Sequence, residues 1–148
     1  MDPSQGFAIV GGTPFDFVGA SASFAGDVNN DKINDIIVSA TGVFSSRGAA
    51  YVIFGKKGTR NDILVASGLA PSEGFAILGE TNTDFFGCSA SYAGDLDGNG
   101  IGDIIIGAYG FGGLTGAAYV IFGQDGNSYT FGTIDLSVGM SSSQGIII

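Results

Sequence analysis

Two short acidic segments of the sequence carry side chains that could bind a metal ion. In both segments, oxygen-bearing side chains stand at positions 1, 3, 5 and 9. Alternate residues of a tight loop can direct their oxygens toward one point, and Ca²⁺ takes about six to eight oxygen ligands. The isoleucine at position 7 would contribute its backbone carbonyl and turn its side chain into the core. The candidate ligands are Asp27, Asn29, Asp31, Ile33 and Asp35 in the first segment, and Asp95, Asp97, Asn99, Ile101 and Asp103 in the second.

The composition of these segments indicates which metal they would bind. Each candidate ligand set holds three carboxylates and one asparagine, and such a cluster repels itself at neutral pH unless a cation is bound. Oxygen ligands from a flexible loop favour Ca²⁺ over Mg²⁺, which tends to keep its waters, and the lack of histidine and cysteine disfavours Zn²⁺. The sequence therefore predicts two Ca²⁺ sites. The alternative is a pair of solvated turns, because Asp, Asn and Gly favour turns without any metal.

The two acidic segments differ at position 6, where a sharp turn favours glycine. The second segment has Gly100 at this position, and the first has Lys32. A lysine in a left-handed backbone conformation costs ~1 kcal/mol, and its positive charge opposes a bound cation. We therefore predict that the first site binds calcium more weakly than the second.

The chain is built from an internal repeat with a period of 68 residues. The segment Gly6–Ile9 recurs as Gly74–Ile77, and the string Gly48–Gly55 recurs unchanged as Gly116–Gly123. Repetition on this scale indicates a repeat architecture in which each unit is one supersecondary element. We expect repeat one at about residues 6–73, repeat two at about 74–143 and the start of a third repeat at 144–148.

Each repeat predicts four short strands and no helix. Apolar runs rich in β-branched and aromatic residues are separated by glycine-rich and acidic turns, which is typical of strands. The strands are expected at residues 20–25, 35–40, 49–54 and 74–78, and at the matching places of the second repeat. Four strands per unit, repeated, is the sheet of a propeller blade. The predicted fold class is therefore all-β, with β-propeller blades of four antiparallel strands.

Composition and charge exclude several kinds of partner. The 148 residues are 45% hydrophobic and 13% charged, with 27 glycines, which argues against disorder and suits a turn-rich β fold. The net charge of −9 would repel nucleic acid and an anionic membrane surface. No apolar run reaches the ~18 residues that span a bilayer, so no membrane insertion is expected. The N-terminal residues show no signal peptide.

The motifs around the acidic segments resemble a known family. The run Asp84-Phe85-Phe86-Gly87, the segment from Asp95 to Asp103 and the following Ile-Ile-Ile-Gly-Ala-Tyr resemble the FG-GAP repeat of integrin α-subunit propellers. The first repeat is a looser copy, and the strand sequences look most like FG-GAP repeats of large secreted bacterial surface proteins. The resemblance implies blades of four antiparallel strands with calcium loops between strands one and two. It also implies that Gly6–Val10, Gly74–Leu78 and Gly145–Ile148 are outer strands.

Two blades alone would leave open sheet edges and faces. Propellers of this family close with about seven blades, and open edges invite pairing with other chains. Either the rest of a longer propeller covers them, or several copies assemble into a closed ring. We favour self-association, for example a trimer with six blades.

The expected function is binding and not catalysis. The resemblance implies a non-catalytic calcium-binding propeller module for extracellular adhesion or protein interaction, with a protein or glycan ligand and Ca²⁺ stabilising the loops. The alternative is an accessory or substrate-binding propeller domain of a secreted hydrolase. The chain has no histidine to act as a general base. Asp16 and Asp84, which precede the Phe-Gly turns, are expected to cap those turns.

Overall fold

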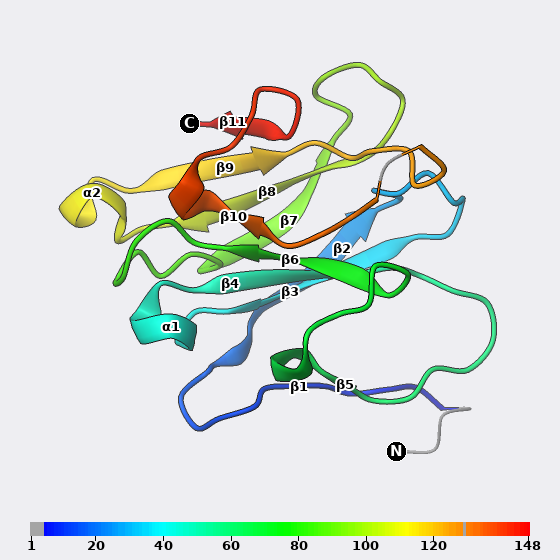
Figure 1. The fold of residues 1–148 in the computed structure, drawn as a ribbon, viewed down its shortest axis with the longest axis horizontal. Coiled ribbons are helices and arrows are strands. Elements are labelled where there is room, and N and C mark those ends of the chain that lie inside the picture. Colours follow the sequence, from blue (N-terminus) through cyan, green and yellow to red (C-terminus); the bar gives the residue numbers. More distant parts are fainter. Residues whose placement is uncertain (1–4, 129) are drawn as a thin grey trace.

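Two antiparallel sheets and a small pair of parallel strands are stacked face to face (Figure 1). The structure is a computed structural model that describes residues 5–128 and 130–148. The first sheet has the strand order β10-β6-β4-β3-β2, and the second has the order β11-β9-β8-β7. The strands are β1 (Ile9–Val10), β2 (Val18–Gly26), β3 (Asp35–Ala40), β4 (Ala49–Ile53), β5 (Ile63–Leu64), β6 (Gly74–Leu78), β7 (Ser89–Gly94), β8 (Asp103–Ala108), β9 (Ala117–Ile121), β10 (Ile134–Asp135) and β11 (Gly145–Ile147).

Both sheets place the same sequence elements in the same order. Each sheet contains an antiparallel array of four strands, β2-β3-β4-β6 in one and β7-β8-β9-β11 in the other. The central strands are rich in Ile, Val and Ala, and all of β4 is buried. The predicted all-β class with four-stranded antiparallel sheets is confirmed. The boundaries of the repeats stay a prediction.

Two short strands pair in a way that the sequence did not predict. β10 joins the first sheet beside β6, and β5 pairs with β1, both in parallel. The expected outer strand at Gly6–Val10 is therefore wrong in extent, because strand geometry covers only Ile9–Val10. Each of these strands has two residues, and such a length carries no hydrophobic periodicity.

The remaining regular elements are short turns. Two helical turns, α1 (Val43–Ser46) and α2 (Phe111–Leu114), connect the two central strands of each sheet. Each has left-handed residues in its middle, which explains why no helical periodicity appears in the sequence. Two 3₁₀ turns, η1 (Val65–Ser67) and η2 (Leu136–Val138), follow β5 and β10. Within the described residues, no helix is long and apolar enough to cross a membrane.

Two hydrophobic clusters hold the layers together. The larger cluster lies between the two sheets and includes Ile37 and Val52 from the first sheet with Ile104 and Tyr119 from the second. The smaller cluster lies between the other face of the first sheet and the layer of β1 and β5. The first sheet therefore uses its two faces toward two different layers, and in both sheets the face with the strand-three tyrosine, Tyr51 or Tyr119, is directed toward the layer that includes the preceding outer-strand segment.

Candidate metal loops

Both acidic segments form loops between the first two strands of a sheet. Loop one, residues 27–34, joins β2 to β3, and loop two, residues 95–102, joins β7 to β8. They lie at the same end of the stacked sheets, as the two connections on the right of Figure 1 show. The position-9 aspartates are the first residues of β3 and β8.

Loop two brings three carboxylates together. Asp95, Asp97 and Asp103 each offer an oxygen, and these oxygens all lie within 4.8 Å of one another. The loop is shaped by its own backbone, because Asp95 accepts hydrogen bonds from Gly98 N at 2.8 Å and from Gly100 N at 2.9 Å. At position 5, Asn99 Oδ1 accepts from Ile101 N at 2.7 Å. Three negative charges at this separation favour a bound cation.

Loop one has the same turn with its carboxylates less closely gathered. Asp27 accepts hydrogen bonds from the backbone N–H groups of Asp31 and Lys32, both at 3.0 Å. Asp31 Oδ1 in turn accepts from Ile33 N at 2.8 Å. Within the described part of the chain, the three aspartates of loop one do not form a group as tight as that of loop two. Asn29 replaces the position-3 aspartate and is buried.

The position-9 aspartates have a structural role that the sequence did not reveal. Asp35 and Asp103 are fully buried. Asp35 accepts from Val28 N at 2.9 Å and from Gly55 N at 2.8 Å. Asp103 makes the matching bonds with Leu96 N at 2.6 Å and Gly123 N at 2.9 Å. Each carboxylate therefore joins the start of its loop to the end of the third strand of its sheet.

Burial also changes the acidity of Asp35. Desolvation raises the pKa of this carboxyl to about 6, against the lowering effect of the hydrogen bonds from Gly55 and Val28. The charges of Asp31 and Asp27 raise the pKa further. Loop one is therefore an environment in which negative charge is costly without a nearby cation.

The position-7 isoleucines do not reach the core. Ile33 and Ile101 are half-buried and lie outside both hydrophobic clusters, which corrects the expected orientation of their side chains. Each lies against a glycine that follows the third strand: a Cβ on Gly55 would approach Ile33 Cγ2 to 2.5 Å, and one on Gly123 would approach Ile101 Cγ2 to 2.7 Å. The backbone carbonyl oxygens of Ile33 and Ile101 remain candidate ligands.

Position 6 is left-handed in both loops. The φ angle is 71° at Lys32 and 85° at Gly100. A residue with a Cβ is strained in this region, and glycine is not. The conformational premise of the predicted difference between the loops is confirmed, while the difference in calcium affinity stays a prediction.

The second sheet covers loop one. Three backbone carbonyls of loop one accept hydrogen bonds from the last residue of loop two and from the segment after β9: Asp27 O from Gly102 N at 3.2 Å, Val28 O from Gln124 N at 2.9 Å and Asn29 O from Gly126 N at 2.9 Å. The side chains at position 2 of the two loops differ in burial: Val28 in loop one is 2% exposed, and Leu96 in loop two is 58% exposed. No local motif in the sequence signals this long-range contact.

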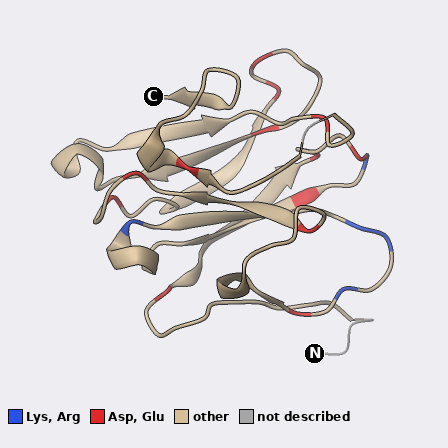
Figure 2. Ribbon diagram, viewed as in Figure 1, with Lys and Arg blue, Asp and Glu red and all other residues tan. Residues whose placement is uncertain are grey.

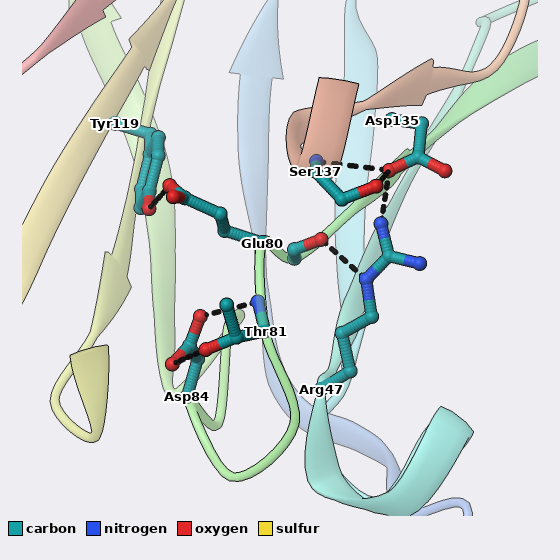
Figure 3. Close-up of polar contacts among 8 residues, drawn as sticks. Arg47, Glu80, Thr81, Asp84, Tyr119, Asp135 and Ser137 are labelled. Atoms are coloured by element: carbon teal, nitrogen blue, oxygen red, sulfur yellow. Dashed lines mark hydrogen bonds and ion pairs between the residues drawn. The ribbon is translucent and has the colours of Figure 1, made fainter. Parts of the chain in front are cut away.

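Other polar residues between the sheets have structural partners. Asp84 accepts from Thr81 N and from Thr81 Oγ1, both at 2.7 Å, which confirms its predicted capping role (Figure 3). Asp16 makes the same kind of contact with Thr13. Figure 3 also shows Arg47 paired with Asp135, which links α1 to β10.

A buried tyrosine makes a further polar contact between the sheets. Tyr119 Oη donates to Glu80 Oε2 at 3.1 Å, as Figure 3 also shows. Burial and this hydrogen bond raise the pKa of the Tyr119 hydroxyl. The interaction joins β9 to the segment that follows β6, so it adds to the contacts that hold the two sheets together.

Comparison with known proteins shows similarity to integrin α subunits. The chain is 32% identical to Homo sapiens integrin alpha-X over 102 residues, which are 67% of this chain and 8% of that protein. It is 37% identical to Caenorhabditis elegans integrin alpha pat-2 over 103 residues, 69% of this chain and 8% of the relative. It is 30% identical to Xenopus laevis integrin alpha-5 over 115 residues, 74% of this chain and 10% of the relative. No family model matches.

Proposed function

We propose that this chain, an integrin α-like FG-GAP repeat region, is a non-catalytic calcium-binding propeller module for extracellular protein interaction. The observation that carries the proposal is the group of three carboxylates in loop two. Loop one has oxygen-bearing residues at the same positions of the repeat. Because the chain spans only 8–10% of the length of the relatives described above, a role in adhesion is part of the proposal.

The donor set of both loops fits a hard divalent cation. Asp95, Asp97 and Asp103 would supply carboxylate oxygens, with Asn99 Oδ1 and the carbonyl of Ile101 completing an all-oxygen set. In loop one the corresponding ligands would be Asp27, Asn29, Asp31, Ile33 and Asp35. A bound Ca²⁺ would neutralise most of the charge that each set concentrates, so we propose two sites.

Calcium would stabilise the sheets through the position-9 aspartates. Asp35 and Asp103 join their loops to the third strands through backbone hydrogen bonds. A cation at loop one would favour the charged form of Asp35, in which both carboxylate oxygens accept. The millimolar calcium of extracellular fluid would keep even weak sites occupied, which fits the proposed extracellular setting.

Calcium titration calorimetry tests the proposal. We expect two binding events for the whole chain and the loss of one event in the variant Asp97→Asn. Glu73→Gln is the matched control, because it removes the same charge from an exposed residue outside the loops and should retain both events. Absence of calcium-dependent heat in the unaltered chain would overturn the proposal.

The second candidate is an accessory or substrate-binding domain of a secreted hydrolase. It is favoured only by the general use of propellers as parts of enzymes. Binding to immobilised glycans, measured against binding to immobilised protein ligands, separates the two. Selective retention on glycans would favour the hydrolase partner domain, and selective retention on proteins would favour the interaction module.

A further inference from the structure

The contact between the two sheets provides a template for a second contact of the same kind. We name two surfaces by their residues. The leading face is the side of the first sheet that carries Phe24, Ile36, Tyr51 and Ile53, and the trailing face is the side of the second sheet that carries Ile105, Val120, Ile146 and Ile148. Inside the chain, the first sheet packs its own trailing side onto the leading side of the second sheet.

The outer part of the trailing face is exposed where its counterpart is buried, although Val120 in the middle of this face is 0% exposed. Phe75 and Ile77 of the first sheet are 4% and 0% exposed, because the second sheet covers them. The residues at the same places in the second sheet, Ile146 and Ile148, are 47% and 70% exposed. Adjacent apolar side chains of this size on a sheet face mark a surface that another element can cover.

The leading face is open at the inner part of the first sheet. Layer β1–β5 covers Tyr51 and Ile53, but Phe24 on β2 is 48% exposed, with its ring edge-to-face against Tyr92 of β7. The first sheet also borders a cavity of about 450 Å³, lined by residues that include Ile33, Asn34, Gly55 and Lys56. In the second sheet the corresponding residues hold loop one, whose Val28 is buried there. The cavity therefore lies at the place that corresponds to the binding place of Val28, the position-2 side chain of loop one.

Backbone groups on the two surfaces have complementary unmet hydrogen bonds. The carbonyls of the first three residues of loop one accept hydrogen bonds from three N–H groups next to the second sheet, at Gly102, Gln124 and Gly126. The matching carbonyls of loop two, at Asp95, Leu96 and Asp97, accept no hydrogen bond within the described residues. The matching N–H groups of the first sheet, at Asn34, Lys56 and Gly58, donate none within the same part of the chain.

Charge favours the same pairing. Three of the five basic residues lie between residues 56 and 60, on the long loop that follows β4. Figure 2 shows this blue segment at the lower right, on the first-sheet side of the molecule, whereas loop two lies at the top, on the second-sheet side. Arg60 is 9% exposed and lines the cavity, and its Nη1 has no hydrogen-bond partner within the described residues. The acidic loop two is the part of the chain whose charge complements this site.

We propose that a second copy of this chain docks head-to-tail, with its leading face against the trailing face of the first copy and Leu96 of the first copy in the cavity beside Ile33 and Lys56 of the second. The contact repeats the internal junction between the sheets, and such a heterologous contact generates a ring or a filament. It goes beyond the proposed function, because it rests on surfaces and backbone groups and not on a bound metal.

The docked pair needs only one of two equivalent strands. The segments that begin at Gly6 and Gly145 match, so that β11 corresponds to residues 6–8 and the next residue, Ile148, corresponds to Ile9 of β1. β11 makes three register pairs with β9, and β1 makes two with β5. We therefore expect β11 to remain and β1 of the docking copy to be displaced.

Light-scattering mass over a concentration series in saturating calcium tests the contact. We expect the unaltered chain to form species of two or more copies, and Leu96→Asp to raise the dissociation constant by about thirtyfold or more, as for a central interface residue. Val138→Asp, at an 83% exposed residue outside both surfaces, is the control and should associate normally. A monomeric mass of the unaltered chain at every concentration would overturn the proposal.

A mixing experiment tests the direction of the contact. Leu96→Asp blocks the trailing side and Phe24→Asp blocks the leading side, so each variant alone should be monomeric and the mixture should form one-to-one pairs. Circular dichroism checks that both variants are folded. Ile146→Asp, on the trailing face and outside both loops, should also prevent association while its calcium titration stays unchanged, which separates failure of this contact from failure of calcium binding. Equal association of both variants alone would contradict the head-to-tail arrangement.

Discussion

Loop one lies against the second sheet, whereas loop two projects into solvent. The two loops share their length, their left-handed position 6 and the buried aspartate at position 9. They differ in their surroundings, because within the described residues only loop one has its first three carbonyls bonded to the connections of a neighbouring sheet. One repeated loop therefore serves two purposes in this chain: it brings oxygen-bearing side chains together, and its outer backbone joins one sheet to the next.

The largest expected effect comes from removing the buried position-9 carboxylates. Asp35→Ala should lower the free energy of unfolding by about 3 kcal/mol, because two N–H groups lose their acceptor at a cost of ~1–3 kcal/mol each. Asp103→Ala should cost less, since loop two is not joined to a second sheet. Urea denaturation in EDTA measures both variants without the contribution of metal.

Glu73→Gln serves as the control for these variants and should stay within about 0.5 kcal/mol of the unaltered chain. A loss below about 1 kcal/mol for Asp35→Ala would mean that its hydrogen bonds do not hold the loop.

A smaller effect is expected at position 2. Val28→Ala removes buried apolar groups from the junction between the sheets and should cost about 2 kcal/mol. Leu96→Ala should cost no more than about 0.5 kcal/mol when it is measured at a dilution at which the chain is monomeric. Equal losses for the two variants would show that the difference in burial between the loops is wrong.

The smallest effect is expected at position 6. Lys32→Gly removes a positive charge that opposes a bound cation at a cost of ~1 kcal/mol and should tighten calcium binding at loop one by roughly fivefold. Gly100→Lys should weaken binding at loop two by a similar factor. Calorimetric titration of the two single variants measures both changes. Identical affinities before and after the exchange would remove the proposed ranking of the sites.

The sequence predicted those parts of the molecule that depend on local pattern. The strands of both sheets follow from apolar runs between turns, and the expected strand at 35–40 coincides with β3. The candidate ligands follow from alternate oxygen-bearing residues, and loop two does bring Asp95, Asp97 and Asp103 together.

The features that the sequence did not predict depend on contacts between distant segments. β5 and β10 are too short to show a period, and they pair in parallel with strands of the preceding layer. The bonds of Asp35 and Asp103 to Gly55 and Gly123 cross 20 residues. The cover over loop one joins residues nearly 100 positions apart. No single-sequence pattern carries such information, because it arises only when the sheets pack.

Calcium binding by the two acidic loops is tested most simply by a thermal melt of the same sample in calcium and in EDTA. Two sites filled at about 100 times their dissociation constants would each add ~2.7 kcal/mol, which corresponds to a shift of roughly 10 °C or more for a chain of this size. We predict that chelation lowers the melting temperature by about this amount. An unchanged melting temperature would show that the acidic loops are turns without a metal, and would contradict the account.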